Sequence, residues 1–126
     1  MRVLYVDDDR INTLLFVETC RFAPGAVVQT AASGAEALEL VLRWRPDLLV
    51  IDLHLPDTDG YALLESLRTQ LRAPRVAAFL CTADEAPLVA APAAAAGFDG
   101  CWTKPVNLST VLQELARRSA ALESGS

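Results

Sequence analysis

The segment Pro46-Asp47-Leu48-Leu49-Val50-Ile51-Asp52 is the clearest indication of the fold class of this chain. Its apolar residues 48–51 are typical of a strand that is covered on both faces of a parallel sheet. The run ends at Asp52, so a buried strand carries a carboxylate at its carboxyl end. The N-terminus repeats this design, because the apolar run 3–6 is followed by aspartates at 7–9. Unit charges about 4 Å apart interact by roughly 4 kcal/mol near a protein surface, and we therefore expect a cation beside these carboxylates.

Composition and charge describe one globular domain. A chain of 126 residues, 52% hydrophobic and 21% charged, is long and apolar enough for a core of its own. The net charge of -5 argues against nonspecific binding to nucleic acid or to anionic membranes. The nearly apolar stretch 87–98 is interrupted by Pro92 and is shorter than the roughly 20 residues of a spanning helix. Because strand-like sequence begins at Arg2, we expect no signal peptide and a cytoplasmic location.

The cysteines and the single lysine stand out in this composition. Cys20, Cys81 and Cys101 are odd in number and show neither a C-x-x-C pair nor zinc-type spacing, so we expect free thiols. Lys104 is the only lysine among eleven cations. An ammonium kept in a background of arginine is a weak indication of a special role.

Along the chain, short apolar runs alternate with longer helical periods, which is the pattern of an α/β domain. The runs predict strands at Arg2–Val6, Ala26–Thr30, Leu48–Ile51, Val76–Leu80 and Cys101–Thr103. Helices are predicted over about Arg10–Phe22, from Ser33 to before Pro46, from Gly60 to before Pro74, between the last two strands, and from Asn107. We expect a domain over residues 1–120 and a flexible tail over 121–126.

Helical spacing predicts which side chains face the core. The expected inner positions are Ala37, Leu38, Val41 and Leu42; Leu64, Leu67 and Leu71; and Leu108, Val111, Leu112 and Leu115. In the first helix, Leu14, Leu15 and Val17 are among the apolar positions. Ser33 and Glu36 form a capping box, and Asn107 can cap the last helix. Pro92 would cost about 3 kcal/mol inside a helix, so the fourth helix is expected to be short, kinked or displaced.

Five strands alternating with five helices predict a doubly wound parallel sheet, whose ligands bind beyond the carboxyl ends of the strands. The polar side chains at these ends are Asp7, Asp8, Asp52, Thr82 and Lys104. Oxygen ligands select a hard cation such as Mg²⁺, which commonly takes one or two carboxylates. With the cation and Lys104 sharing its negative charge, Asp52 can act as a nucleophile toward phosphorus. Thr82 can then donate a hydrogen bond to a phosphoryl oxygen.

These residues resemble the receiver domain of the two-component response regulators over nearly the whole chain. The shared motifs are Val6-Asp7-Asp8-Asp9, Pro46 to Asp52 as quoted above, Leu55-Pro56-Asp57-Thr58-Asp59-Gly60, Thr82-Ala83 and Thr103-Lys104-Pro105. The resemblance implies a flavodoxin-like sheet with strand order 2-1-3-4-5. It also implies phosphotransfer from a sensor histidine kinase or a histidine phosphotransfer protein, a conformational switch for partner binding, and self-dephosphorylation. A signalling receiver of this kind is not a separate enzyme, and a homodimer is one form of assembly.

The resemblance assigns roles to individual residues. Asp52 is implied as the phosphoacceptor. Mg²⁺, or Mn²⁺ in its place, is implied at Asp8, Asp52 and the backbone carbonyl of His54, with Asp7 in the metal site to orient a bound water. Asp9 is left out of the site, because a helix cap or a solvated charge explains it.

Further roles follow from the same resemblance. Thr82 and Lys104 are implied to contact the phosphoryl oxygens. The bond between Lys104 and Pro105 is implied to be cis, which proline tolerates cheaply. Gly60 is implied in a turn that needs a positive φ.

The lifetime of the acyl phosphate is implied to depend on residues next to the site. These are His54, whose side chain we expect at the solvent-exposed mouth of the site, and Ala83 and Asp84. Replacing His54 is therefore predicted to alter dephosphorylation more than phosphorylation. Asp57 and Asp59, in the same loop as His54, are predicted as turn formers.

The chain departs from the family pattern at one position of the switch. Cys101 stands three residues before the lysine, where the family usually has an aromatic residue whose rotamer is coupled to the threonine. Trp102 would point to the opposite face of a regular strand and cannot replace it. We therefore expect phosphorylation to shift the loop after Thr82.

Three other functions fit part of the pattern. A magnesium phosphohydrolase that forms an aspartyl phosphate would use His54 as its acid, but no cap insertion is present. A nucleotide-binding module is disfavoured, because aspartates stand where a G-x-G-x-x-G turn would bind phosphate. A receiver that signals without phosphorylation is the remaining alternative.

Overall fold

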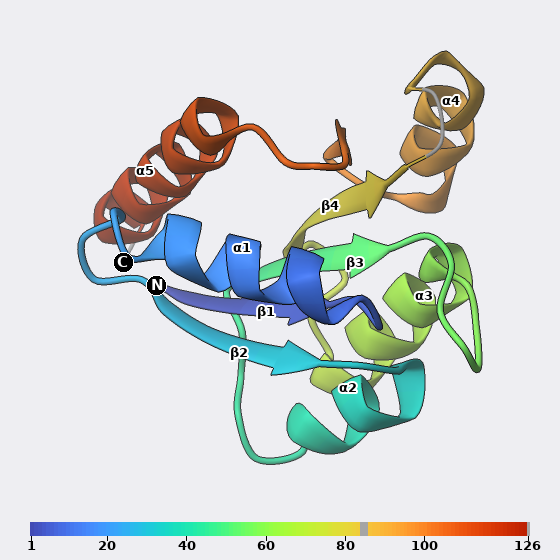
Figure 1. The fold of residues 1–126 in the computed structure, drawn as a ribbon. Coiled ribbons are helices and arrows are strands. Elements are labelled where there is room, and N and C mark those ends of the chain that lie inside the picture. Colours follow the sequence, from blue (N-terminus) through green and yellow to red (C-terminus); the bar gives the residue numbers. More distant parts are fainter. Residues whose placement is uncertain (84–85, 126) are drawn as a thin grey trace.

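The computed structural model describes residues 1–83 and 86–125, which form a five-stranded sheet between helices (Figure 1). Neighbouring strands pair in parallel in the order β2-β1-β3-β4-β5. The strands are β1 (Arg2–Val6), β2 (Val27–Ala31), β3 (Leu48–Asp52), β4 (Ala77–Thr82) and β5 (Gly100–Thr103). The helices are α1 (Arg10–Cys20), α2 (Gly34–Leu40), α3 (Gly60–Leu71), α4 (Ala86–Ala96) and α5 (Leu108–Gly125). The predicted α/β class, doubly wound sheet and strand order are confirmed.

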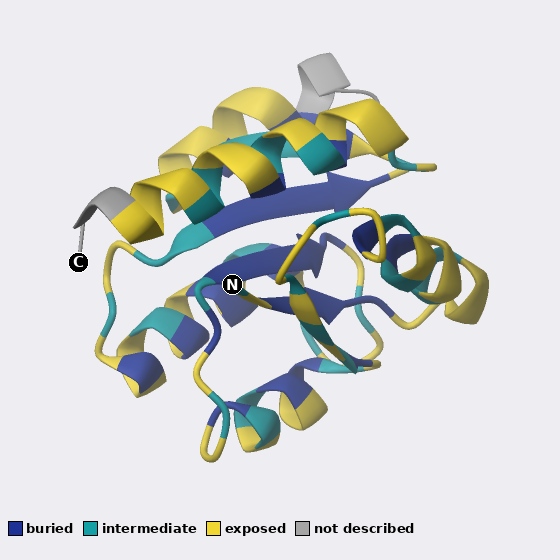
Figure 2. Cartoon of the chain, turned by 90° about the vertical axis from the view of Figure 1, so that its left-hand side faces the viewer, coloured by how far each residue is buried: buried dark blue, intermediate teal, exposed yellow. Residues whose placement is uncertain are grey.

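Successive side chains of the central strands point to opposite faces of the sheet. On one face, Tyr5 of β1 belongs to a buried cluster with Phe16 of α1 and Val111 of α5. On the other face, Leu4 belongs to a cluster with side chains of α2, α3 and α4, such as Leu64. Figure 2 shows the strands buried between helices whose outer surfaces are exposed. All of β3 is buried, which explains why its sequence is an uninterrupted apolar run.

Side-chain caps start the helices. Asp9, Ser33, Asp59 and Asn107 each accept a hydrogen bond from the backbone N–H three residues later, at 2.8–3.1 Å. Such a cap stabilises a helix by about 1 kcal/mol, because it satisfies a backbone donor that has no partner within the helix. The predicted caps Ser33 and Asn107 are confirmed, and Asp9 is a cap as well. Asp59, predicted only as a turn former, caps α3.

Some of the predicted inner helix positions are wrong. Leu42 and Leu108 have exposed fractions of 74% and 48%. The apolar Leu14 and Leu15 of α1, for which no face was predicted, are exposed as well. Apolar side chains surround much of α1, so helical spacing alone does not single out its inner face. The contact that decides the orientation of α1 is the stacking of Phe16 on the ring of Tyr5, with centroids 4.3 Å apart. The predicted positions that are buried are Ala37, Val41, Leu64, Leu67, Leu71, Val111 and Leu115.

The fourth helix is longer than expected. α4 has 11 residues and continues across Pro92. Alanine, the residue with the highest helix propensity, dominates its sequence. Pro92 lies on the exposed side of α4, where water can bond the carbonyl that loses its helical partner. Ala93 and Val89 face the core instead.

The last helix reaches nearly to the end of the chain. α5 continues to Gly125, so it takes in most of segment 121–126, which was predicted as a tail. The boundary of the domain at residue 120 stays a prediction. Neither α5 nor any other helix in the described part of the chain is long and apolar enough to cross a membrane.

Strand β5 separates its two unusual residues. Cys101 packs against the cluster of α2, α3 and α4, whereas Trp102 is buried on the opposite face and stacks on Phe79 at a centroid distance of 4.7 Å. The prediction that Trp102 points away from Cys101 is confirmed. The thiols are free, as predicted. Cys20 and Cys81 are buried as expected for such thiols, whereas Cys101 is only half-buried.

Candidate functional site

The predicted site residues gather at one edge of the sheet, which we call the carboxyl edge. Asp7 follows β1, Asp52 ends β3, Thr82 ends β4, and Lys104 follows β5. Because the strands run parallel, their carboxyl ends lie on the same side of the molecule (Figure 1). The carboxyl edge is defined here by these residues together with Asp8.

Lys104 joins the two buried carboxylates. Its Nζ lies 2.9 Å from Oδ2 of Asp7 and 3.0 Å from Oδ2 of Asp52. The lysine side chain is only 10% exposed, so water screens these contacts weakly. The one lysine of the chain therefore neutralises part of the negative charge around Asp52.

Asp7, Asp8 and Asp52 form a cluster that could hold a metal ion. One carboxylate oxygen from each lies within 4.8 Å of the others. Asp7 and Asp52 are buried, whereas Asp8 is exposed, so an ion could exchange with solvent on the Asp8 side. The donors are all hard oxygen atoms, and this set fits Mg²⁺ or Mn²⁺ better than a softer metal.

Burial and neighbouring charges act in opposite directions on the pKa values of this edge. Burial raises the pKa of Asp52 above its ordinary value, although the hydrogen bond and charge of Lys104 lower it. Burial lowers the pKa of Lys104, but the hydrogen bonds and charges of Asp7 and Asp52 outweigh it, and the net shift is upward. Lys104 therefore stays protonated, and the negative charge of Asp52 depends on its cationic neighbours.

Tyr5 was not predicted as part of this arrangement. Its hydroxyl donates a hydrogen bond of 2.8 Å to Oδ2 of Asp7, and the backbone N–H of Asp9 donates one of 2.9 Å to Oδ1. The spacing was the available signal, because residues two apart in a strand point to the same face. A tyrosine two positions before a carboxylate can therefore reach it.

Strands β4 and β5 are tied together beside the site. The backbone N–H of Lys104 donates to the carbonyl of Thr82 at 2.8 Å. Thr82 is fully buried, and the Lys104–Pro105 bond is cis, as predicted. Ala83 is exposed next to Thr82. Asp84 lies outside the described residues, and so does part of the loop whose shift we predict.

Gly60 meets a different requirement from the one expected. It is the first residue of α3 and does not have a positive φ. A Cβ atom there would lie 2.7 Å from the carbonyl oxygen of Asp52 and 3.2 Å from Cα of Leu53. Glycine is needed because α3 begins in close contact with the backbone of β3 and its following residue.

The loop between β3 and α3 is attached to α2. Oδ1 and Oδ2 of Asp57 accept hydrogen bonds of 2.9 Å from the backbone N–H groups of Gly34 and Ala35. These bonds lower the pKa of Asp57. Asp57 is therefore more than the predicted turn former, because it holds the loop that carries His54. The side chain of His54 is exposed, as predicted.

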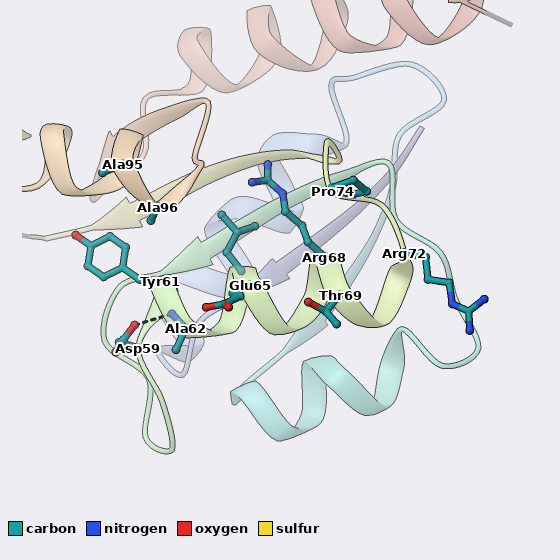
Figure 3. Close-up of a pocket in the computed structure, with 11 residues that line it drawn as sticks. Asp59, Tyr61, Ala62, Glu65, Arg68, Thr69, Arg72, Pro74, Ala95 and Ala96 are labelled. Atoms are coloured by element: carbon teal, nitrogen blue, oxygen red, sulfur yellow. Dashed lines mark hydrogen bonds between the residues drawn. The ribbon is translucent and has the colours of Figure 1, made fainter.

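A larger hollow lies away from the carboxyl edge. A groove of about 920 Å³ between α3 and α4 is lined by residues such as Tyr61, Arg68 and Ala96 (Figure 3). The hollow beside Asp7 and Asp8 has about 370 Å³. None of the residues of the carboxyl edge lines the larger groove. The chemistry of the side chains, and not the size of a hollow, points to the site.

The comparison with protein families agrees with this geometry. A profile of the response regulator receiver domain matches residues 3–116. The chain belongs to this family. It is a receiver domain of the two-component response regulators, and its acidic cluster at the carboxyl edge fits a phosphoacceptor site.

Curated relatives that match this chain are longer than it. A protein-glutamate methylesterase/protein-glutamine glutaminase of Archaeoglobus fulgidus is 35% identical over 124 residues, covering 94% of this chain and 35% of that protein. The probable transcriptional regulatory protein TcrX of Mycobacterium tuberculosis is 33% identical over 120 residues, covering 93% of this chain and 50% of that protein. This chain thus spans between a third and a half of the length of these curated relatives.

A solved structure shares the fold over nearly its full length. The chemotaxis response regulator CheY4 of Vibrio cholerae has 29% sequence identity and a TM-score of 0.81. The match covers 93% of this chain and 97% of CheY4. The receiver domain described here is therefore similar in fold to a response regulator of chemotaxis.

Proposed function

We propose that Asp52 accepts a phosphoryl group from the phosphohistidine of a sensor histidine kinase or a histidine phosphotransfer protein. The observation that supports this most directly is the position of Asp52, which contacts Lys104 and lies in one acidic cluster with Asp7 and Asp8 after β1. A carboxylate oxygen of Asp52 attacks the phosphorus, a P–O bond forms, and the P–N bond to the donor histidine breaks. The imidazole leaves with the bonding electrons and takes up a proton.

The residues around Asp52 would supply most of the catalysis by position and charge. Lys104 already contacts Asp52 and would move its ammonium toward a phosphoryl oxygen. The hydroxyl of Thr82 would donate to a second oxygen. Asp7, Asp8, Asp52 and the backbone carbonyl of His54 would hold Mg²⁺, which neutralises charge on the phosphoryl oxygens when it is bound. Mn²⁺ would serve in its place.

The product would be an acyl phosphate with a limited lifetime, read by a partner. We propose that His54, Ala83 and Asp84 tune the rate of its hydrolysis, since they are implied to lie beside the phosphoryl group. The domain is proposed as a signalling receiver and not as an enzyme, since the methylesterase name belongs to relatives of which this chain matches about a third. A cytoplasmic location and a homodimeric form stay predictions.

The proposed function can be tested with acetyl phosphate as a small donor. The parent chain is incubated with acetyl phosphate and Mg²⁺, and its intact mass is measured. We expect an adduct of one phosphoryl group that disappears with Asp52→Asn and with a chelator. Asp59→Asn is the matched control, because asparagine also caps a helix and Asp59 lies outside the acidic cluster. An adduct that persists in Asp52→Asn contradicts the assignment, and no adduct on the parent favours a receiver that signals without phosphorylation.

A further inference from the structure

The buried hydroxyl of Tyr5 determines how Asp7 can bond. Oδ2 of Asp7 accepts from the Tyr5 hydroxyl at 2.8 Å and lies 2.9 Å from Nζ of Lys104. Oδ1 accepts from the backbone N–H of Asp9 at 2.9 Å. A carboxylate oxygen offers about two acceptor positions, so Oδ2 is saturated and Oδ1 keeps one position open.

We propose that Tyr5 is a positioning residue that fixes which oxygen of Asp7 is available to the cation site. By occupying one position of Oδ2 beside Lys104, the tyrosine leaves Oδ1 as the oxygen that can bond a metal or a metal-bound water. This inference rests on the proposed function, because it assumes that the carboxyl edge binds Mg²⁺.

The surroundings of Tyr5 suit this role. Its ring is 1% exposed and lies nearly parallel to that of Phe16, with 14° between the planes, so the hydroxyl has little freedom to move. The hydroxyl is held against Asp7 and donates its hydrogen bond to that carboxylate. A buried hydroxyl without this acceptor would itself be costly.

The hydrogen bond also matters when Lys104 moves. If the lysine turns toward a phosphoryl oxygen, Oδ2 of Asp7 loses its ammonium partner. The Tyr5 hydroxyl remains bonded to Oδ2, so this oxygen of the buried Asp7, which is 2% exposed, keeps a hydrogen-bond partner. Tyr5 would thus keep Asp7 in place both before and after phosphotransfer.

The test removes the hydroxyl and leaves the ring. The dissociation constant of Mg²⁺ is measured by isothermal titration calorimetry for the parent chain and for Tyr5→Phe. We expect Mg²⁺ to bind about tenfold more weakly in Tyr5→Phe, because a hydrogen bond to a charged group is lost. Tyr61→Phe is the matched control at the other tyrosine of the chain, and it should leave the Mg²⁺ affinity unchanged.

A second readout separates positioning from damage to the fold. The Mg²⁺ concentration that half-saturates the reaction with acetyl phosphate should rise by the same factor in Tyr5→Phe, while the rate at saturating Mg²⁺ stays within about twofold of the parent. Phe16→Leu disturbs the same cluster without removing the hydroxyl, and it should not change the half-saturating concentration.

The outcomes separate this inference from the proposed function. If the parent binds Mg²⁺ and Tyr5→Phe binds it equally well, the role of Tyr5 is overturned and the proposed function stands. A lower rate at saturating Mg²⁺ with unchanged affinity also overturns it. A parent chain that binds no Mg²⁺ overturns the metal part of the proposed function and this inference together.

Discussion

At the carboxyl edge, charged side chains from different strands bond directly to one another, whereas α4 contacts the rest of the molecule through small apolar side chains. Lys104 lies within 3.0 Å of both Asp7 and Asp52. α4 instead places Val89 and Ala93 in the core, beside a groove that it shares with α3. Burial contributes about 25 cal/mol per Å² of apolar surface, so an alanine contributes little. Stability at the carboxyl edge therefore depends on a few groups, and stability at α4 on many weak contacts.

The largest effect on stability is expected at Lys104, whose ammonium pairs with the two buried carboxylates of Asp7 and Asp52. Lys104→Met leaves Asp7 and Asp52 without their cation and is predicted to lower the free energy of unfolding by about 3 kcal/mol at pH 7. Urea unfolding measures this change. The loss should shrink at low pH, because protonation removes the repulsion between the carboxylates. Arg117→Met is the control, since its ion pair with Glu114 is exposed on the arginine side. Equal midpoints for the parent and Lys104→Met would mean that the carboxyl edge is not held by this charge.

A methyl group at the start of α3 tests the close packing next to Asp52. Gly60→Ala is predicted to cost about 2 kcal/mol, because the new Cβ meets backbone atoms that cannot move aside. Gly100→Ala is a useful comparison, since its Cβ would meet only the ring of Phe79. We expect a smaller loss there in the same urea titration. A larger loss at Gly100 than at Gly60 would contradict the importance of the α3–β3 contact.

The stability of α4 can be increased. Pro92→Ala restores a backbone donor within α4 and is predicted to stabilise the protein by about 1 kcal/mol. The amides of α4 should then exchange more slowly with deuterium. The exchange rates of the β3 amides should change only as far as the stability of the whole protein changes. Ala91→Ser, at the neighbouring exposed position, should give no such protection. Unchanged exchange in Pro92→Ala would show that the proline does not limit the stability of α4.

The smallest predicted effect is a pH-dependent one in the loop between β3 and α3. The pKa of Asp57 is lowered by its hydrogen bonds from Gly34 and Ala35. The contribution of Asp57 to the free energy of unfolding is therefore complete above the pKa that it has in the unfolded state. The contribution is lost as the pH falls through the lowered folded-state pKa. Asp57→Asn should therefore be slightly less stable than the parent at pH 7, with a difference that narrows toward pH 3. A difference that grows on acidification would contradict this attachment.

Much of the site could be predicted because its residues follow strands that the sequence marks clearly. The apolar run before Asp52 and the one before Asp7 are buried strands, and each carboxylate lies where the run ends. Parallel strands bring such ends to one edge regardless of the details of packing. The motifs at Thr82 and Lys104 follow the same rule. The roles of these residues in phosphotransfer still await the experiments described above.

Other features could not be predicted, because they depend on distances between residues or segments that the sequence does not specify. The inner face of α1 could not be predicted, since apolar side chains lie around the helix and the stacking of Phe16 on Tyr5 selects one side. Gly60 was predicted for the wrong reason. Glycine is needed because α3 begins against the backbone of β3, and not because a turn requires a positive φ. Pro92 was given too much weight, since on the exposed side of a helix water can bond the carbonyl that loses its helical partner.

The α/β class and the charged residues of the carboxyl edge could be inferred from the amino-acid sequence, and the strand order from the family resemblance. This was possible because burial on both faces and a polar strand end are local properties of the chain. The folded structure was needed to show that Tyr5 holds Asp7, that Asp57 attaches its loop to α2, and that Lys104 lies between two carboxylates. These contacts depend on hydrogen-bond geometry of a few tenths of an ångström, which arises only when the packed elements fix the side chains.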